Sequence, residues 1–445
     1  MRIAFVPIDN RPVCYTLPKL IAEIDNSVEL LLPAREDLGD LTKIANLENI
    51  FNWLQNLNNL DGIILSLDTL AYGGLIPSRR CPETFTQIKD RILRLKEILL
   101  EKKCKILAFS SIMRISNNNY NEEEKLYWAE YGKKIFAYSY KFHKNGTKTN
   151  SEIPQEILEN YLNTRNRNFE VNKIYLDWQK EGLLDSLVFS KDDCAEFGLN
   201  VMEAKELEAL GGYTKTGADE IPLSLLSRIT GGKMKVCPIF LEPEHKNLIS
   251  NYEDVSIENS VKGQLELANC TITPENEADI ILYVNNFKNH QGEIVMKVPT
   301  EEFDRTFTVP NRPYMIADVR FANGADNNFI KELFKNKITD KNFFGYSAWN
   351  TSANSLGSLI LCAKMKFYAK KYNKNAFEKV QITRFLDDWA YQANVRQKLQ
   401  TPDKKLMPQK IKSFEKILEE AIITPINVKY EFPWKRLFEV EIEFS

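Results

Sequence analysis

The sequence predicts an α/β protein with mostly parallel sheet and helices on both faces. Short apolar runs alternate along the chain with longer stretches of helical periodicity. Strand, helix, strand in repetition is the pattern of parallel strands joined by right-handed crossovers. The 445 residues exceed what one hydrophobic core usually serves, which favours two or three domains.

Nine apolar runs are the strand candidates, and in chain order they are residues 3–8, 28–32, 62–67, 105–109, 186–189, 235–240, 279–284, 314–317 and 343–346. Between them, stretches such as "ETFTQIKDRILRLKEILLEKK" and "NNFIKELFKNK" have helical periodicity. Nine strands fit two flavodoxin-like or Rossmann-like units more easily than one β/α barrel, which has eight. The barrel remains the alternative.

Three segments are expected from the composition along the chain. Residues 1–230 form an N-terminal α/β domain, with a helical, aromatic-rich insertion at about 120–181. Residues 231–360 form a second α/β unit, which starts near the turn "ITGGKMK". Residues 361–445 contain a helix, "TRFLDDWAYQANVRQKL", and then the alternating "VKYEFPWKRLFEVEIEF", which predicts a pair of strands.

Composition argues against several classes of function. The net charge is −2 and the basic residues are scattered, so neither nucleic acid nor a membrane surface is an expected partner. No GxGxxG follows the first strand and no GxxxxGK[ST] occurs, which argues against an NAD or ATP cofactor. Seven widely spaced cysteines without CxxC, no signal peptide and no apolar run near 18 residues predict a cytoplasmic protein with reduced thiols.

Histidine is scarce, with three in the whole chain. Zinc sites and Ser-His or Cys-His catalysis usually need at least one well-held imidazole. Chemistry is therefore expected to depend on carboxylates, amides, tyrosine and arginine, with no cofactor.

Polar residues follow most of the predicted strands. Because the carboxyl ends of parallel strands share one edge, loops there converge on ligands. The candidate binding residues after these strands are Asp9, Asn10, Arg11, Asp68, Tyr72, Arg114, Lys191, Asp318, Arg320, Trp349, Asn350 and Asn354, and the fifth run ends in the pair Asp192 and Asp193. Any single loop of this kind suits a turn or a helix cap. Recurrence on one edge, with Arg, Trp and Tyr present, favours a shared site in one concave pocket.

Two further acidic pairs have simpler interpretations. Asp219 and Glu220 precede an apolar helix that has Pro222 in its first turn, and the helix dipole stabilises acidic side chains at such an N-terminus. They are also possible additional acids of the site. Asp387 and Asp388 are adjacent on a helix, so at most one can face a site, and a solvated helix face is the expected explanation.

Six ordered motifs resemble one family of uncharacterised bacterial proteins, DUF4127. They are "PIDNRP", "DTLAYGGLIPSR", "SKDDCAEFG", "TGADE", "ADVRFANGADN" and "SAWNTSANSLG", and the similarity spans nearly the whole chain, including "RFLDDWAYQANVR". The resemblance implies that these loop ends belong to one shared site, and it implies no activity.

Carboxylates, amides, arginine and tryptophan suit a polyhydroxylated ligand, through hydrogen bonds to hydroxyls and stacking on a sugar ring. Cleavage of a glycosidic bond needs one carboxylic acid to protonate the leaving oxygen and a second carboxylate beside it. Adjacent acids separate their two pKa values, so one can keep its proton near neutral pH. The leading hypothesis is a glycoside hydrolase acting on a sugar, possibly N-acetylated, with Asp193 as acid/base and Asp192 as its partner.

Two alternatives remain open. A Mg²⁺- or Mn²⁺-dependent isomerase or hydrolase on a sugar or small acid would use Asp192, Asp193, Glu220 and Asp318 as ligands. A non-catalytic sugar-binding protein would use the same polar loops without turnover.

Overall fold

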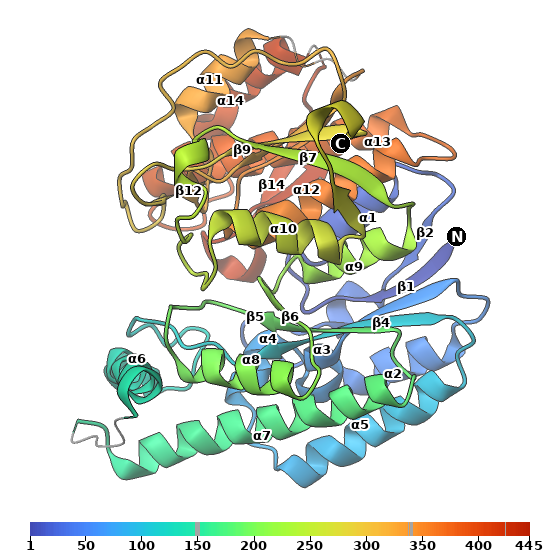
Figure 1. Ribbon diagram of the computed structural model, residues 1–445, viewed down its shortest axis with the longest axis vertical. Coiled ribbons are helices and arrows are strands. Elements are labelled where there is room, and N and C mark those ends of the chain that lie inside the picture. The colour runs from blue at the N-terminus through green and yellow to red at the C-terminus, as the bar shows by residue number, and fades with distance from the viewer. Residues whose placement is uncertain (147–151, 337, 339–340, 423) are drawn as a thin grey trace. The chain divides into compact units, whose positions relative to one another are not determined.

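The structure is a computed structural model that describes residues 1–146, 152–336, 338, 341–422 and 424–445 (Figure 1). The chain divides into two compact units, and each is described by itself. Unit 1 consists of Met1–Asn10, Glu29–Pro222 and Tyr252–Asp254, and unit 2 of Arg11–Val28, Leu223–Asn251 and Val255–Ser445. Both contain an open parallel sheet flanked by helices, so the α/β prediction is confirmed and the barrel alternative is wrong. The segment boundaries at 230 and 360 stay a prediction.

Unit 1 is built on a six-stranded parallel sheet with the order β2-β1-β3-β4-β5-β6. Its strands are β1 (Arg2–Val6), β2 (Glu29–Leu31), β3 (Gly62–Ser66), β4 (Lys105–Ile112), β5 (Ser186–Lys191) and β6 (Thr214–Thr216). The order of the first five is that of flavodoxin-like sheets, in which the direction of winding reverses between β1 and β3. β3 is buried along its whole length, which explains its continuous apolar run.

Helices of unit 1 occupy the stretches with helical periodicity, including the predicted insertion. They are α2 (Leu47–Asn56), α3 (Leu67–Tyr72), α4 (Leu75–Arg80), α5 (Phe85–Leu100), α6 (Trp128–Asn145), α7 (Gln155–Lys180) and α8 (Leu199–Ala209). Thr84 and Gln87 form a capping box that starts α5, and buried Ile88, Ile92 and Leu95 give it one apolar face. α5 and α7 pack along each other, as Figure 1 shows.

Unit 2 is built on a five-stranded parallel sheet with the order β13-β11-β9-β7-β8. The strands are β7 (Met234–Phe240), β8 (Cys270–Ile272), β9 (Ile280–Asn285), β11 (Tyr314–Asp318) and β13 (Phe343–Ser347). Read from β8, the order is second, first, third, fourth, fifth, so the flavodoxin-like order occurs again, with its reversal between β7 and β9. Apolar residues of these strands pack with α10 (Ile257–Leu267) and α12 (Ser352–Phe367) into one core.

The remaining elements include the predicted C-terminal segment. α9 (Ile221–Ile229) follows β6, and unit 2 also contains α1 (Thr16–Ala22), α11 (Asn327–Lys335), α13 (Lys374–Arg384), a π-helix (Phe385–Val395), α14 (Leu406–Ile422) and the antiparallel pair β14 (Val428–Glu431) and β15 (Glu441–Phe444). The predicted strand pair is therefore confirmed, and the predicted helix forms as the end of α13 followed by the π-helix, whereas α14 was not predicted. The π-helix falls in the predicted helix and has a wider turn, a form that occurs frequently at functional sites. None of the described helices has both the length and the apolar character needed to cross a membrane.

Candidate functional site

The pairing of β4 with β5 brings a basic and an acidic residue together at the carboxyl edge of the unit 1 sheet. Ile112 is paired with Lys191 at the ends of the two strands. Arg114 and Asp193 each lie two residues beyond that pair, and neighbouring strands are about 4.8 Å apart. The guanidinium and carboxylate therefore meet, with Arg114 Nη1 donating to Asp193 Oδ2 at 3.0 Å.

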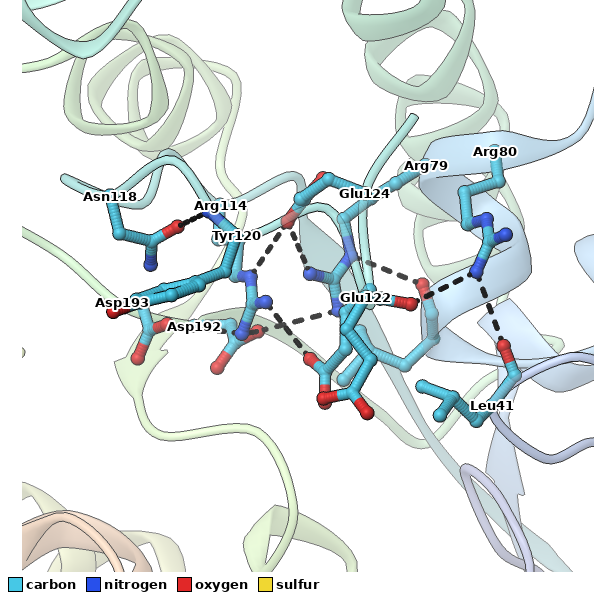
Figure 2. A network of polar contacts seen from close by, with 12 residues as sticks. Leu41, Arg79, Arg80, Arg114, Asn118, Tyr120, Glu122, Glu124, Asp192 and Asp193 are labelled. Atoms are coloured by element: carbon cyan, nitrogen blue, oxygen red, sulfur yellow. Dashed lines mark hydrogen bonds and ion pairs between the residues drawn. The ribbon is translucent and has the colours of Figure 1, made fainter. Parts of the chain in front are cut away.

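Two arginines and four acids form a polar cluster around this contact (Figure 2). Arg114 also donates to Glu124 Oε1 at 3.0 Å and to Glu123 Oε2 at 2.9 Å. Arg79, on α4, donates to the same Glu124 oxygen at 2.7 Å. We call Arg79, Arg114, Glu123, Glu124, Asp192 and Asp193 the acid–arginine cluster.

Asp192 is held less tightly than the other acids of the acid–arginine cluster. Its Oδ2 atom lies 3.7 Å from Arg114 Nη1 and 4.0 Å from Arg79 Nη2. Among the described residues, neither Asp192 Oδ2 nor Arg79 Nη2 has a hydrogen-bond partner. A buried donor and a buried acceptor thus lie 4.0 Å apart without a hydrogen bond, and a group able both to accept and to donate would satisfy them.

The acids of the cluster outnumber its cations, which favours retention of a proton. Burial, and then the charge of Asp193, raise the pKa of Asp192, against the opposing effect of Arg114 and Arg79. Burial also raises the pKa of Asp193, although Arg114 hydrogen-bonds its carboxylate. The geometry therefore favours a shared proton that resides mainly on Asp192. The side chains of Asp192 and Asp193 are 17% and 27% exposed, so part of each side chain is open to solvent, although Asp192 Oδ2 is buried.

The backbone at Asp193 is strained. Its φ angle is +39°, in the left-handed region that side chains other than Gly, Asn and Asp rarely adopt. Such conformations persist where the surrounding structure holds them, and they cluster at functional sites.

α3 and α4 follow β3 at the same edge of the sheet. Asp68 Oδ2 accepts from Ser111 N at 2.7 Å, and burial raises the pKa of Asp68 to about 7. Gly73 and Gly74 have φ angles of +86° and +137° and turn the chain from α3 into α4, which carries Arg79. A Cβ at Gly73 would lie 2.9 Å from Ala45 N, so the close approach that requires glycine is to the protein's own backbone.

Other predicted residues of unit 1 lie around this cluster in different roles. Lys191 pairs with Asp254 at 2.6 Å. The buried Asp219 and Glu220 immediately precede α9, and the charge of Asp219 adds to the raised pKa of Asp192. The remaining three are Asp9, which is buried, Asn10, whose carbonyl accepts from Arg35, and Tyr72, which is buried beneath the guanidinium of Arg167.

In unit 2, Asp318 and Arg320 belong to a closed network. Asp318 is fully buried and accepts from Asn285, from Tyr346 Oη and from Asp326 N, at 2.8, 2.9 and 3.0 Å. Burial and the charge of Asp326 raise the pKa of Asp318 to about 7. Arg320, equally buried, donates to Asn285, to Glu242 and to the Glu301 carbonyl. These bonds occupy both side chains, which indicates a structural role.

The other predicted residues of unit 2 lie in the turn after β13 and near the C-terminal strands. Asn350 has a φ of +77°, and its Oδ1 accepts from Asn354 at 3.2 Å. Trp349 is buried against Phe438. Arg11 pairs with Glu439 at 3.6 Å. The expectation that the residues of both units line one pocket stays a prediction.

The interpretation of Asp387 and Asp388 as a solvated helix face is wrong. Asp388 is fully buried and its Oδ2 accepts from Ala348 N at 2.6 Å, so it holds the turn that carries Trp349. Asp387 is half-buried beside it, and burial followed by the charge of Asp388 raises the pKa of Asp387 to about 8.

The ligand set suggested for Mg²⁺ or Mn²⁺ is not assembled in either unit. Asp192, Asp193 and Glu220 belong to unit 1, whereas Asp318 belongs to unit 2, where hydrogen bonds occupy both its oxygens. Within the described part of the chain, no group of three or more His, Cys, Asp or Glu side chains is arranged to hold a metal ion.

The sequence did not mark Glu123, Glu124 or Arg79 as candidates, although Arg79 ends the motif "DTLAYGGLIPSR". The run "NEEEK" follows β4 by nine residues and reads as a solvated charge run. The only feature that indicates a role at the site is the position of this run between the end of β4 and a helix, in a loop at the carboxyl edge of the unit 1 sheet. Which of the three glutamates turns inward depends on tertiary packing.

Comparison with protein families gives one match that covers nearly the whole chain. The model described as "Protein of unknown function (DUF4127)" matches residues 3–443. A comparison with curated proteins found no match.

Proposed function

Because the chain belongs to the DUF4127 family, whose description assigns no activity, we propose a function from its own residues: a glycoside hydrolase centred on Asp192 and Asp193. The observation that carries the proposal is the buried pair of polar atoms Arg79 Nη2 and Asp192 Oδ2. These atoms are 4.0 Å apart and neither has a hydrogen-bond partner among the described residues. A sugar hydroxyl can accept from the guanidinium and donate to the carboxylate at once.

The protonation of the pair supports acid catalysis. Asp192, with its raised pKa, would give its proton to the glycosidic oxygen as the carbon–oxygen bond breaks. Asp193, ionised against Arg114, would stabilise the positive charge that develops at the anomeric carbon. Water would then supply the hydroxyl of the new sugar end and return a proton to Asp192. This assignment reverses the roles expected from the sequence, because Arg114 hydrogen-bonds Asp193 and holds Asp192 only at 3.7 Å.

The test uses a panel of aryl glycosides, including N-acetylated ones, with the parent chain and the variants D192N and D193N. We expect the parent to cleave at least one member and each variant to lose at least about 100-fold in kcat/KM, the lower range for loss of a general acid. D177N, at an exposed position on α7, is the matched control and should retain activity.

Three outcomes would count against this function. The assignment is wrong if both variants keep full activity on a substrate that the parent cleaves. A parent that binds sugars and cleaves none is the sugar-binding protein of the alternative hypothesis. Activity that EDTA abolishes and Mg²⁺ or Mn²⁺ restores would favour the metal-dependent alternative.

A further inference from the structure

Unit 1 contains an open groove that the acid–arginine cluster does not occupy. Its volume is about 1030 Å³, at the upper end of the range of about 300–1000 Å³ for pockets that bind small molecules. One wall is the turn from α4 into α5, Arg80 to Phe85; another is the segment Lys125 to Tyr127; the third is a face of α7. A groove of this size suits a ligand longer than one sugar ring.

The α7 wall is a polar stripe at helical spacing. Its residues are Glu156, Asn160, Asn163, Thr164, Arg167 and Glu170, which recur every three or four positions and share one side of the helix. Asn166 also lines the groove, and the three asparagine side chains are exposed. Each exposed amide offers both a donor and an acceptor.

The charges that line the groove balance. Three cations (Arg80, Lys125 and Arg167) face three acids (Glu83, Glu156 and Glu170). Glu83 is already paired with Arg91, and Glu170 with Lys173. The Arg167 guanidinium donates hydrogen bonds to the carbonyls of Ser78, Cys81 and Glu83. Without an excess of accessible positive charge, the groove favours an uncharged polar ligand over an anion.

The groove and the acid–arginine cluster share two stretches of backbone. Arg79 and Glu124 bond to each other within the cluster. Their chain neighbours, Arg80 and Lys125, line the groove, where Lys125 Nζ donates to Asn160 Oδ1 and Thr164 Oγ1, each at 2.7 Å. Figure 2 shows Arg79 directed toward the acids and Arg80 directed toward the carbonyls of Leu41 and Glu122.

We propose that this groove binds an uncharged oligosaccharide, through the amides of α7 and the rings of Phe85 and Tyr127. The inference rests on the proposed function for the bond that is cleaved, and it adds that the substrate is a chain of sugars. Aromatic and amide side chains together match a sugar, which has an apolar ring face and hydroxyls at its edge.

The test measures binding to a chain that does not turn over. D192N is titrated calorimetrically with cellopentaose, maltopentaose and chitopentaose, with the matching disaccharides, and with inorganic phosphate as an anionic probe. We expect one pentasaccharide to bind at least tenfold more tightly than its disaccharide, and phosphate not to bind. Introducing N163A or N166A into the D192N chain should weaken pentasaccharide binding about two- to tenfold, as loss of one hydrogen bond predicts. N145A, an exposed asparagine on α6 outside the groove, should leave it unchanged.

The two proposals fail in different ways. Pentasaccharide binding that depends on Asn163 and Asn166 supports oligosaccharide binding in the groove, even if the parent hydrolyses no glycoside. Three results would contradict the proposal that the groove binds an oligosaccharide: equal affinities for two and five sugars, binding of phosphate alone, or unchanged binding in the N163A and N166A variants. Hydrolysis that requires Asp192 would still support the catalytic assignment in those cases.

Discussion

Five strands of each parallel sheet follow the same order, but the acids at the two carboxyl edges have different surroundings. At the unit 2 edge, Asp318 and Arg320 are fully buried and their polar atoms are taken up by neighbours. At the unit 1 edge, the acid–arginine cluster is partly exposed and leaves a donor and an acceptor without hydrogen bonds among the described residues. The Asp318–Arg320 network is closed, whereas the acid–arginine cluster contains two buried polar atoms without a hydrogen bond among the described residues.

This difference has an energetic consequence. A fully bonded buried network stabilises the fold, and breaking it leaves charges without partners in a medium of low dielectric constant. A site that keeps strain and unsatisfied groups reduces stability in exchange for function. Removal of the Arg320 guanidinium should therefore lower stability, whereas removal of the Asp192 carboxyl should become more favourable to stability as pH rises.

The largest effect is expected at Arg320. R320A would remove the guanidinium from the fully buried Asp326 and leave Glu242 paired with Arg305 alone, and it should lower the free energy of unfolding by about 3–5 kcal/mol in urea denaturation. R305A is the matched control, since Arg305 contacts the same Glu242 oxygen at 2.6 Å from a side chain that is 47% exposed. It should lose less than about 1 kcal/mol. Equal losses in the two variants would contradict the closed-network description.

Replacement of one aspartate by asparagine at each edge should separate the two roles. D318N would place an amide among three donors that now bond to both carboxylate oxygens, and should lower stability by about 1–3 kcal/mol. D192N removes a carboxyl whose ionisation opposes folding. Its pKa is raised in the native state, so the native chain binds more protons than the unfolded one, and this group's contribution to stability falls as pH rises from about 4 through neutrality.

The stability of D192N relative to the parent should accordingly rise with pH. We expect a gain of at least about 1 kcal/mol between pH 4 and pH 8, equivalent to a native pKa raised by one unit or more. Thermal and urea unfolding of both chains at the two pH values measure it. A pH-independent difference would mean that Asp192 is ionised in the native state much as it is in the unfolded chain.

The smallest effect is expected from the backbone at Asp193. D193A places alanine at a φ of +39° and should lower stability by about 1–2 kcal/mol relative to D193N, because asparagine tolerates the left-handed region. Urea denaturation of these two variants compares the strain directly, since both have lost the carboxylate. Equal stabilities would show that the angle is not maintained in the folded chain.

The sequence predicted the strands well because their signal is local. All nine apolar runs are strands, and the alternation near the C-terminus corresponds to β14 and β15. Four short strands were missed, because two or three residues give too little pattern: β6, β8, β10 (Gly292–Glu293) and β12 (Phe321–Ala322). Arg114, Asp192 and Asp193 could be anticipated to meet because they follow neighbouring parallel strands.

Other features depend on contacts that no local pattern encodes. The burial of Asp388 follows from its bond to Ala348, 40 positions away in the chain. The opposite characters of the two edges depend on whether a partner such as Tyr346 reaches the acid, and "ADVRFANGADN" and "SKDDCAEFG" look equally polar as sequences. Identical residue types therefore predicted ligand sites at both edges, whereas the Asp318 and Arg320 side chains form a structural network.

Carbon-13 NMR of the aspartate carboxyls measures most directly whether the Asp192–Asp193 pair stores a proton. The parent chain, labelled at aspartate Cγ, is titrated from pH 3 to pH 9, and comparison with D192N assigns the resonance. A midpoint well above the ordinary aspartate value of about 3.9 is expected, with a second inflection as Asp193 responds. Complete ionisation of both carboxyls by pH 5 would contradict the retained proton on the Asp192–Asp193 pair, and with it the role of Asp192 as the catalytic acid.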